Sequence, residues 1–353
     1  MSQTIVRAVS GIGEKAPACF LVETGGARFL LDLGEAPAGV FPDLQGVGRV
    51  DAILVSHSHA DHIGGLHLAD MVGDPPLYAT AMTRAFAGHA RLHAARSLPL
   101  HAAIDIAGVR VDTGRAGHAA GGIWMRLGGE EGVLYSGDLC RESLLHPLDT
   151  PLPARVLIAD ASYGTYDEDL APAMQHLLGR ARRETLLLPL PPTGRGIEIA
   201  VLFFEAGIPL ALCDQHRHVA ELMLAADAET LVEGGTGRIA AMLAGAARLG
   251  EDFSPRGTMI AGNGAATGGL ARSLFQRFLG DDAVSIVFTG HVEADTPAGA
   301  ALAAGEAEFL RWNVHPRRRD LIWLHEAVRP SRTLYAFCAP RVGLAIEAAI
   351  RGD

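Results

Sequence analysis

The sequence has a single lysine, four cysteines and no apolar run that approaches the length of a membrane span. The cysteines lie far apart without a C-x-x-C pair, so they predict reduced cytoplasmic thiols rather than a disulfide framework. A transmembrane helix needs about 20 consecutive apolar residues, which argues against a membrane protein. The N-terminal residues lack a charged segment followed by an apolar core, the pattern of a secretory signal. We therefore expect a cytoplasmic protein with no membrane partner.

Positive charge is also scarce, with 30 Lys and Arg against 40 Asp and Glu and a formal net charge of -10. A protein that covers nucleic acid with a basic surface has the opposite balance, although a local basic channel is compatible with these numbers. The 353 residues, 49% of them hydrophobic, suffice for one large domain or two ordinary ones.

Two apolar patterns divide the chain. Its first part consists of short apolar runs separated by glycine turns, as in the hairpin predicted for residues 19–34. From Leu170 onward, helical stretches alternate with apolar strands, which predicts a parallel α/β unit. The C-terminal part predicts a helix, a strand within residues 332–340 and a terminal helix.

A cluster of potential metal ligands follows a short apolar strand in LVSHSHADHIGG, residues 54–65. Its ligand candidates are His57, His59, Asp61 and His62. Packing does not explain four such residues within six positions, whereas imidazole and carboxylate groups suit Zn²⁺ and related divalent ions. Two further candidates, His118 and Asp138, lie downstream in a glycine-rich loop and directly after a strand and Gly137.

This order of residues resembles the metallo-β-lactamase superfamily. The resemblance implies an αββα sandwich with a dinuclear centre at one sheet edge. It assigns His57, His59 and His118 to one ion, Asp61 and His62 to the other, and Asp138 to both. FLLDLG matches the early strand of that fold, and the resemblance gives its Asp32 the role of holding the ligand loop in place.

Further motifs resemble the β-CASP nuclease branch of the superfamily. IADASYGTY, residues 158–166, is similar to an acidic-Ser-Tyr-Gly signature with Asp160 at the acidic position. GRGIEI, residues 194–199, resembles a helix start of that branch, and residues 258–299 resemble its glycine-rich loop, helix and strand. NVHPRRRDLIWL resembles a later motif and places His315 at its histidine.

The implied layout is α/β, a metallo-β-lactamase sandwich with an inserted α/β β-CASP domain. We expect the sandwich in residues 1–170 and 305–353 and the insert in residues 171–304. The resemblance implies metal-dependent hydrolysis of a nucleic-acid phosphodiester, most often in RNA, by exonuclease or endonuclease cleavage. Asp61, Asp160 and His315 are the expected catalytic residues, with His315 as a general acid beside the leaving oxygen. Zn²⁺ is the expected ion, with Mn²⁺ as the alternative because Asp61 and Asp138 offer hard oxygen ligands.

The sequence departs from the branch where a histidine normally follows in the last strand. Here that strand reads TLYAFCAP, and the alignment puts Cys338 at the ligand position. Two outcomes are open: Cys338 ligates the second ion as a thiolate, or the second site is weakened.

Two other functions are compatible with the same motifs. A small-molecule ester, thioester or lactone hydrolase on this scaffold would suit the acidic balance, and a degenerate, non-catalytic member is the third hypothesis. Surface positions are predicted for His89, His93 and His325, and also for His216 and His218, whose H-x-H pattern lacks a following Asp or Gly context.

Overall fold

The computed structural model describes residues 4–13 and 16–351, and the chain forms two compact units. Unit 1 comprises residues 1–141, 146–168 and 315–353, and unit 2 comprises residues 142–145 and 169–314. Unit 2 is therefore an insertion in the sequence of unit 1. Among the described residues, none of the helices combines the length and the apolar character that a membrane crossing requires.

The first sheet of unit 1 changes from antiparallel to parallel along its strand order. Its strands are, in spatial order, β1 (Ile5–Ser10), β2 (Cys19–Thr24), β3 (Ala27–Leu31), β4 (Ala52–Leu54), β5 (Leu77–Ala79) and β6 (Arg96–Ser97). β1 to β3 pair antiparallel, and β3 to β6 pair parallel. The predicted hairpin is confirmed as β2 and β3, and its turn residues Gly25 and Gly26 have φ of 59° and 85°, which favours glycine.

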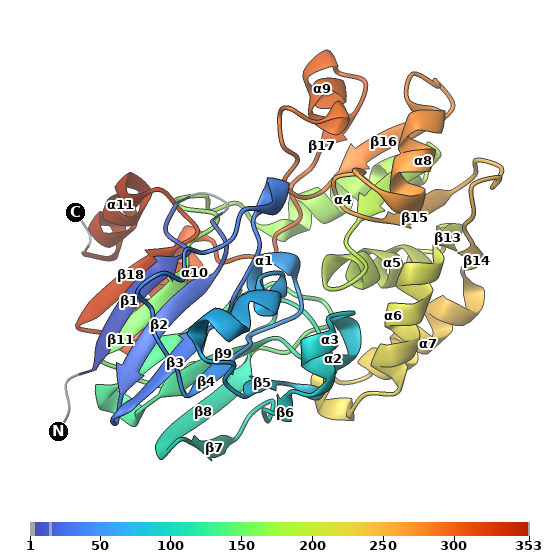
Figure 1. Ribbon diagram of the computed structural model, residues 1–353. Coiled ribbons are helices and arrows are strands. Elements are labelled where there is room, and N and C mark those ends of the chain that lie inside the picture. Colours follow the sequence, from blue (N-terminus) through green and yellow to red (C-terminus); the bar gives the residue numbers. More distant parts are fainter. Residues whose placement is uncertain (1–3, 14–15, 352–353) are drawn as a thin grey trace. The chain divides into compact units, whose positions relative to one another are not determined.

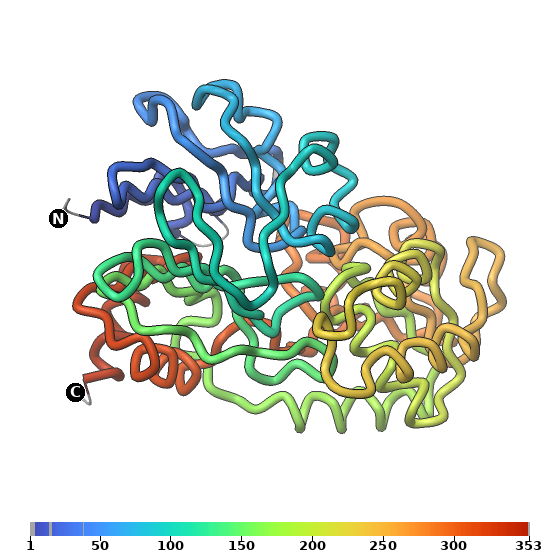
Figure 2. The backbone as a smooth tube through the Cα atoms, turned by 90° about the horizontal axis from the view of Figure 1, so that it is seen from below, coloured from blue at the N-terminus to red at the C-terminus, as the bar shows by residue number. Residues whose placement is uncertain are grey.

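The second sheet of unit 1 joins the middle of the chain to its C-terminal part. Its strands are, in spatial order, β18 (Arg332–Ala336), β11 (Val156–Asp160), β10 (Val133–Tyr135), β9 (Ile123–Leu127), β8 (Val109–Arg115) and β7 (Ala103–Ile106). β18 pairs parallel with β11, so the red segment that contains β18 lies beside the green segment that contains β11 in Figure 2. The chain thus returns to unit 1 after the insertion and completes this sheet.

Alternating side chains build three apolar layers in unit 1. Phe20, Leu31 and Leu54 of the first sheet and Tyr135 and Ile158 of the second belong to one buried cluster between the sheets. The residues next to them in sequence point to the outer faces and pack against helices. The helical segments near the first sheet are α1 (Ala60–Ile63), η2 (Leu66–Val72), α2 (Ala81–Phe86) and α3 (Ala90–His93), and those on the second are α10 (Arg318–Val328) and α11 (Pro340–Arg351) (Figure 1). The result is the αββα sandwich that the sequence predicts.

Unit 2 contains the parallel α/β sheet predicted from the alternation of helices and strands. Its strands are, in spatial order, β14 (Ala247–Arg248), β13 (Leu210–Leu212), β15 (Thr258–Gly262), β12 (Leu186–Leu190), β16 (Ser285–Phe288) and β17 (Glu308–Phe309). All of the pairs are parallel. Its helices are α4 (Leu170–Ala181), α5 (Arg195–Glu205), α6 (Asp214–Leu224), α7 (Gly235–Gly245), α8 (Gly269–Phe278) and α9 (Pro297–Ala304).

Two details of unit 2 differ from the sequence predictions. The unit extends to Val314 rather than ending at residue 304, because β17 pairs with β16. His216 was expected on the surface, but it is fully buried on α6, with Nδ1 3.1 Å from Cys213 Sγ. Its neighbour His218 is exposed, as predicted.

Candidate metal centre

The ligand loop, defined as residues 56–62, leaves the sheet at the end of β4 and enters α1. Backbone hydrogen bonds fix it to the segments before β2 and after β3: Ala18 N donates to Asp61 O at 2.8 Å, and Leu33 N donates to His62 O at 2.9 Å. Gly34 allows this close approach, since a Cβ there would lie 1.7 Å from Asp61 O. The positions of the ligand side chains therefore depend on backbone contacts as well as on any bound ion.

Asp138 reaches the same place from the other sheet. It follows β10 and Gly137, whose φ is 54° and at which a Cβ would come within 3.0 Å of Ser56 Cβ. A side chain at Gly137 would push the two sheets apart at the point where their ligands meet.

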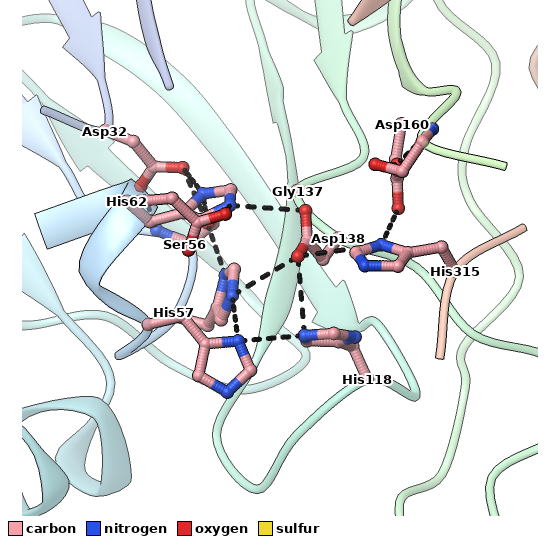
Figure 3. A network of polar contacts seen from close by, with 12 residues as sticks. Asp32, Ser56, His57, His62, His118, Gly137, Asp138, Asp160 and His315 are labelled. Carbon is pink, nitrogen blue, oxygen red and sulfur yellow. Dashed lines mark hydrogen bonds and ion pairs between the residues drawn. The ribbon is translucent and has the colours of Figure 1, made fainter. Parts of the chain in front are cut away.

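The first ligand group contains three histidines and one carboxylate. His59 Nδ1 lies 3.1 Å from both His57 Nε2 and His118 Nε2, and Asp138 Oδ2 lies 3.6 Å and 3.4 Å from those two nitrogens. Figure 3 shows His57, His118 and Asp138 converging. Ligand atoms around a tetrahedral Zn²⁺ at about 2.0–2.1 Å are about 3.4 Å apart, so the observed spacing fits such an ion.

The second ligand group shares Asp138 and adds two residues of α1. His62 Nε2 lies 3.2 Å from Asp138 Oδ1 and 3.8 Å from Asp61 Oδ2. His62 and Asp138 are buried, whereas the side chain of Asp61 is 51% exposed. His62 Nε2 makes no hydrogen bond to any described residue, as expected of a nitrogen that is oriented toward a cation.

Asp32 orients the His62 ring through its Nδ1 atom. Its carboxylate accepts hydrogen bonds at 2.7 Å from Ser56 N, Ser56 Oγ and the Tyr135 hydroxyl, and it lies 2.7 Å from His62 Nδ1. Because Nδ1 donates its hydrogen to Asp32, the lone pair of His62 is on Nε2, on the side of Asp138 and Asp61. Burial and the Asp32 charge raise the pKa of Tyr135 well above its ordinary value, so its hydroxyl remains a donor.

The electrostatics of the centre favour a cation. Burial lowers the pKa of His57 well below its usual range, and the neighbouring histidines lower it further. Burial alone would disfavour the Asp138 carboxylate, but the surrounding histidines hold its pKa well below the usual range. Burial also opposes charge on His62, yet Asp138, Asp61 and Asp32 hold its pKa well above the ordinary value. The neutral form of His57 and the ionised form of Asp138 are those that bind metal, and on His62 a bound cation would replace the proton of Nε2.

A third group places His315 beside the metal ligands. His315 Nδ1 lies 2.8 Å from Asp160 Oδ2 and 3.7 Å from Asp138 Oδ2. Asp160 is itself fixed by hydrogen bonds from Ser162 N at 3.0 Å and Ser162 Oγ at 2.6 Å. Although these three residues are spaced like ligands, the close pairing of His315 with Asp160 suits a positioned proton donor.

The structure does not bring Cys338 to these groups. Its side chain is buried on the outer face of the second sheet with Trp124, Leu139 and Leu321, and its Sγ is 3.9 Å from Tyr335 O. The preceding residue, Phe337, points the other way, and its ring centroid lies 5.5 Å from that of His62. Because Phe337 has a φ of 63°, the chain is not extended here, and the turn leaves Phe337 on the inner face of the sheet and Cys338 on the outer face.

Eight of the nine expected site residues therefore meet in one place: His57, His59, Asp61, His62, His118, Asp138, Asp160 and His315. The sequence reasoning missed Ser56, Tyr135 and Phe337. Ser56 and Tyr135 carry a weak signal, because each is a polar residue at the end of an apolar strand next to a ligand segment.

Comparisons with known proteins agree with this geometry. Residues 12–170 match the metallo-beta-lactamase superfamily. The chain is 24% identical over 251 residues to the "Transcription termination factor FttA" of Cenarchaeum symbiosum, which covers 57% of this chain and 39% of the relative. It is 25% identical over 250 residues to the "Endoribonuclease YSH1" of Yarrowia lipolytica, covering 56% of this chain and 29% of the relative.

A third relative is the "Cleavage and polyadenylation specificity factor 73" of Drosophila melanogaster, 23% identical over 237 residues that cover 54% of this chain and 34% of the relative. The matches thus span well under half the length of these curated relatives. The match over residues 12–170, the sandwich fold and the ligand groups confirm the predicted resemblance to the metallo-β-lactamase superfamily, and the three relatives agree with the predicted resemblance to its β-CASP branch.

Proposed function

We propose that this protein is a metal-dependent phosphodiesterase that cleaves RNA or single-stranded nucleic acid. The observation that carries the proposal is the pair of ligand groups that share Asp138, with His315 and Asp160 beside them. A relative whose printed name is that of an endoribonuclease supports RNA as the substrate class. We further propose that unit 2 is the β-CASP domain and that the location is cytoplasmic, where its four cysteines, which form no disulfide, would remain reduced.

The proposed chemistry divides between the ions and the side chains. Divalent ions bound by the two groups would activate water and offset negative charge on the phosphate. His315 donates a proton to the leaving oxygen, and Asp160 holds its ring through the 2.8 Å contact to Nδ1. Because Nδ1 faces Asp160, the transferable proton is on Nε2. Asp61, with its half-exposed carboxylate, lies where substrate and water reach the centre.

Zn²⁺ is the proposed ion of the first group. Three imidazole nitrogens and one carboxylate form a donor set that suits Zn²⁺ better than Mg²⁺ or Ca²⁺. The second group, with two carboxylates and one imidazole, is also compatible with Mn²⁺.

A small-ester hydrolase is the alternative function, and the arginines after His315 favour it. Arg318 and Arg319 are both paired with Asp167, at 3.1 Å and 3.0 Å, so part of their charge is compensated. Their side chains remain 47% and 48% exposed, and a phosphate would have to compete with Asp167 for them. Together with the net charge of -10, this pairing weakens the attraction of a long polyanion.

The deciding experiment compares substrates on one preparation of metal-loaded protein. Single-stranded RNA labelled at either end, single-stranded DNA and a p-nitrophenyl ester are incubated with wild type and with His59→Ala. We expect RNA cleavage that requires His59 and is abolished by a chelator. Ester hydrolysis with the same dependence, and no cleavage of either nucleic acid, would support the alternative. Absence of all three activities from protein that retains its ions would contradict both.

A further inference from the structure

The two ligand groups differ in how many protein atoms they offer. The first has four residues, His57, His59, His118 and Asp138, whereas the second has three, of which Asp138 is shared. The third residue of the second group, Asp61, has a side chain that is 51% exposed, so water competes for its carboxylate. A third group of Asp138, Asp160 and His315 also has ligand spacing, but the proposed function assigns the 2.8 Å pair of His315 Nδ1 and Asp160 Oδ2 to proton donation.

A phenyl ring lies beside the second group. The centroids of Phe337 and His62 are 5.5 Å apart, whereas the ring centroids of the first-group histidines are 4.7 Å to 4.9 Å apart. The distance between the Phe337 and His62 rings is therefore only slightly longer than the distances between the histidine rings of the first ligand group. Phe337 is 8% exposed, its ring centroid lies 6.2 Å from that of Phe20, and the ring offers no atom that ligates a divalent ion.

The backbone fixes the direction of Phe337. Its φ is 63°, in the left-handed region that a phenylalanine rarely adopts. Three hydrogen bonds hold this conformation: Phe337 N donates to Gly11 O at 2.8 Å, Gly13 N to Cys338 O at 3.0 Å, and Ala161 N to Ala336 O at 3.0 Å. If the backbone turned so that Cys338 rather than Phe337 faced the metal centre, these hydrogen bonds would break and the thiol would leave its apolar surroundings.

We propose that Phe337 makes the two metal positions unequal, so that the protein holds one ion tightly and binds a second only weakly. The tight ion belongs to the first group, and the weak position is the one formed by Asp61, His62 and Asp138. Phe337 is thus the residue that sets metal stoichiometry. This inference rests on the metal centre of the proposed function.

The test measures bound metal rather than activity. The full chain is loaded with excess Zn²⁺, or with Mn²⁺ in a parallel sample, and dialysed against metal-free buffer. Ions per chain are then counted by native mass spectrometry and elemental analysis, and stepwise affinities are measured by titration calorimetry. We expect one retained ion for wild type and a second, much weaker binding step.

Phe337→His is the decisive variant, with Phe337→Leu as its control for altered packing. Loss of even an outer partner of a ligand typically costs about 10- to 100-fold in metal affinity, so we expect a new imidazole to tighten the second step by at least about 100-fold. Phe337→Leu should retain one ion. Cys338→Ser should also retain one ion, because Cys338 is not a ligand in the proposed arrangement. Loss of a tightly held ion in this variant would instead identify the thiolate as a ligand.

Each outcome decides the inference. Two tightly held ions in wild type would overturn it, whether or not Cys338→Ser removes one of them. A folded Phe337→His that still holds one ion would show that Phe337 does not limit the second site. Should Phe337→His fail to fold, Phe337→Asp takes its place, because aspartate tolerates a left-handed φ and also offers a ligand atom; a folded Phe337→Asp with no stronger second step would overturn the inference. Wild type that retains no ion would refute the metal centre of the proposed function itself.

Discussion

Buried polar side chains have different surroundings in the two units. In unit 1, ionisable groups of both sheets, among them His57, His62 and Asp138, are directed at a common place, and their nearest partners are one another. In unit 2, Glu198 and His216 are equally buried, but neither belongs to a group of described residues with metal-ligand spacing. Glu198 accepts hydrogen bonds from Ser143 Oγ and from Leu144 N at 3.2 Å.

The difference shows how a buried charge can indicate function. Burial raises the pKa of Glu198, against the hydrogen bonds it accepts, and lowers the pKa of His216 to about 4, so both shift toward their neutral forms. Asp138 shifts the other way, toward the ionised form, because it is surrounded by histidines. A buried group that remains charged needs a counter-charge, which the histidines around Asp138 provide and which the proposed divalent ion would supply when bound.

The largest expected effect comes from removing the carboxylate that both ligand groups share. Asp138→Asn keeps the shape of the side chain but removes its charge, so both metal positions lose their common ligand. We expect loss of retained metal and of hydrolysis, measured by elemental analysis and by the RNA cleavage assay. Because Gly34 and the backbone bonds hold the ligand loop, the circular dichroism spectrum should be unchanged. Retention of one tight ion in Asp138→Asn would contradict the shared role.

The next largest effect concerns proton donation. Asp160→Asn removes the group that orients His315, and general acid catalysis typically contributes about 100- to 10,000-fold. We expect kcat to fall within this range while KM and the number of retained ions stay close to wild type. The alkaline branch of the pH–rate profile, on which His315 loses its proton, should also shift to lower pH, which a purely structural change would not cause. An equal fall in retained metal would instead make Asp160 a ligand.

A smaller effect on metal affinity is expected from Asp32, the residue that orients His62. Asp32→Asn keeps an acceptor for the Tyr135 hydroxyl but weakens the contact to His62 Nδ1. Losses of this kind typically reduce metal affinity by about 10- to 100-fold. Titration calorimetry should show weakening of the step assigned to the second group and little change in the first. Equal weakening of both steps would place the effect in the loop rather than in His62.

The comparison of the units also shows what the sequence could predict. The ligand loop was readable because its residues are close in sequence and chemically unusual, and the alternation of helices and strands predicted the sheet of unit 2. The position of Phe337 was not readable, because it depends on a left-handed φ and on contacts to Gly11 and Gly13, more than 300 residues away in sequence. His216 was misplaced because an isolated polar residue gives no sign that Cys213 will be its partner.

The smallest effect concerns the stability of unit 2 rather than activity. His216 is neutral in the folded protein, with a pKa of about 4 against an ordinary value of 6.5. The unfolded chain therefore binds more protons between these values, so the free energy of unfolding rises as pH increases from 4 to 6.5. The full contribution is about 3 kcal/mol, lost progressively on acidification.

Urea unfolding at several pH values should show that the free energy of unfolding depends less on pH for His216→Gln than for wild type. His218→Gln is the matched control, because His218 is exposed on the same helix and should leave the slope unchanged. Equal slopes for wild type and His216→Gln would mean that His216 is protonated inside the fold.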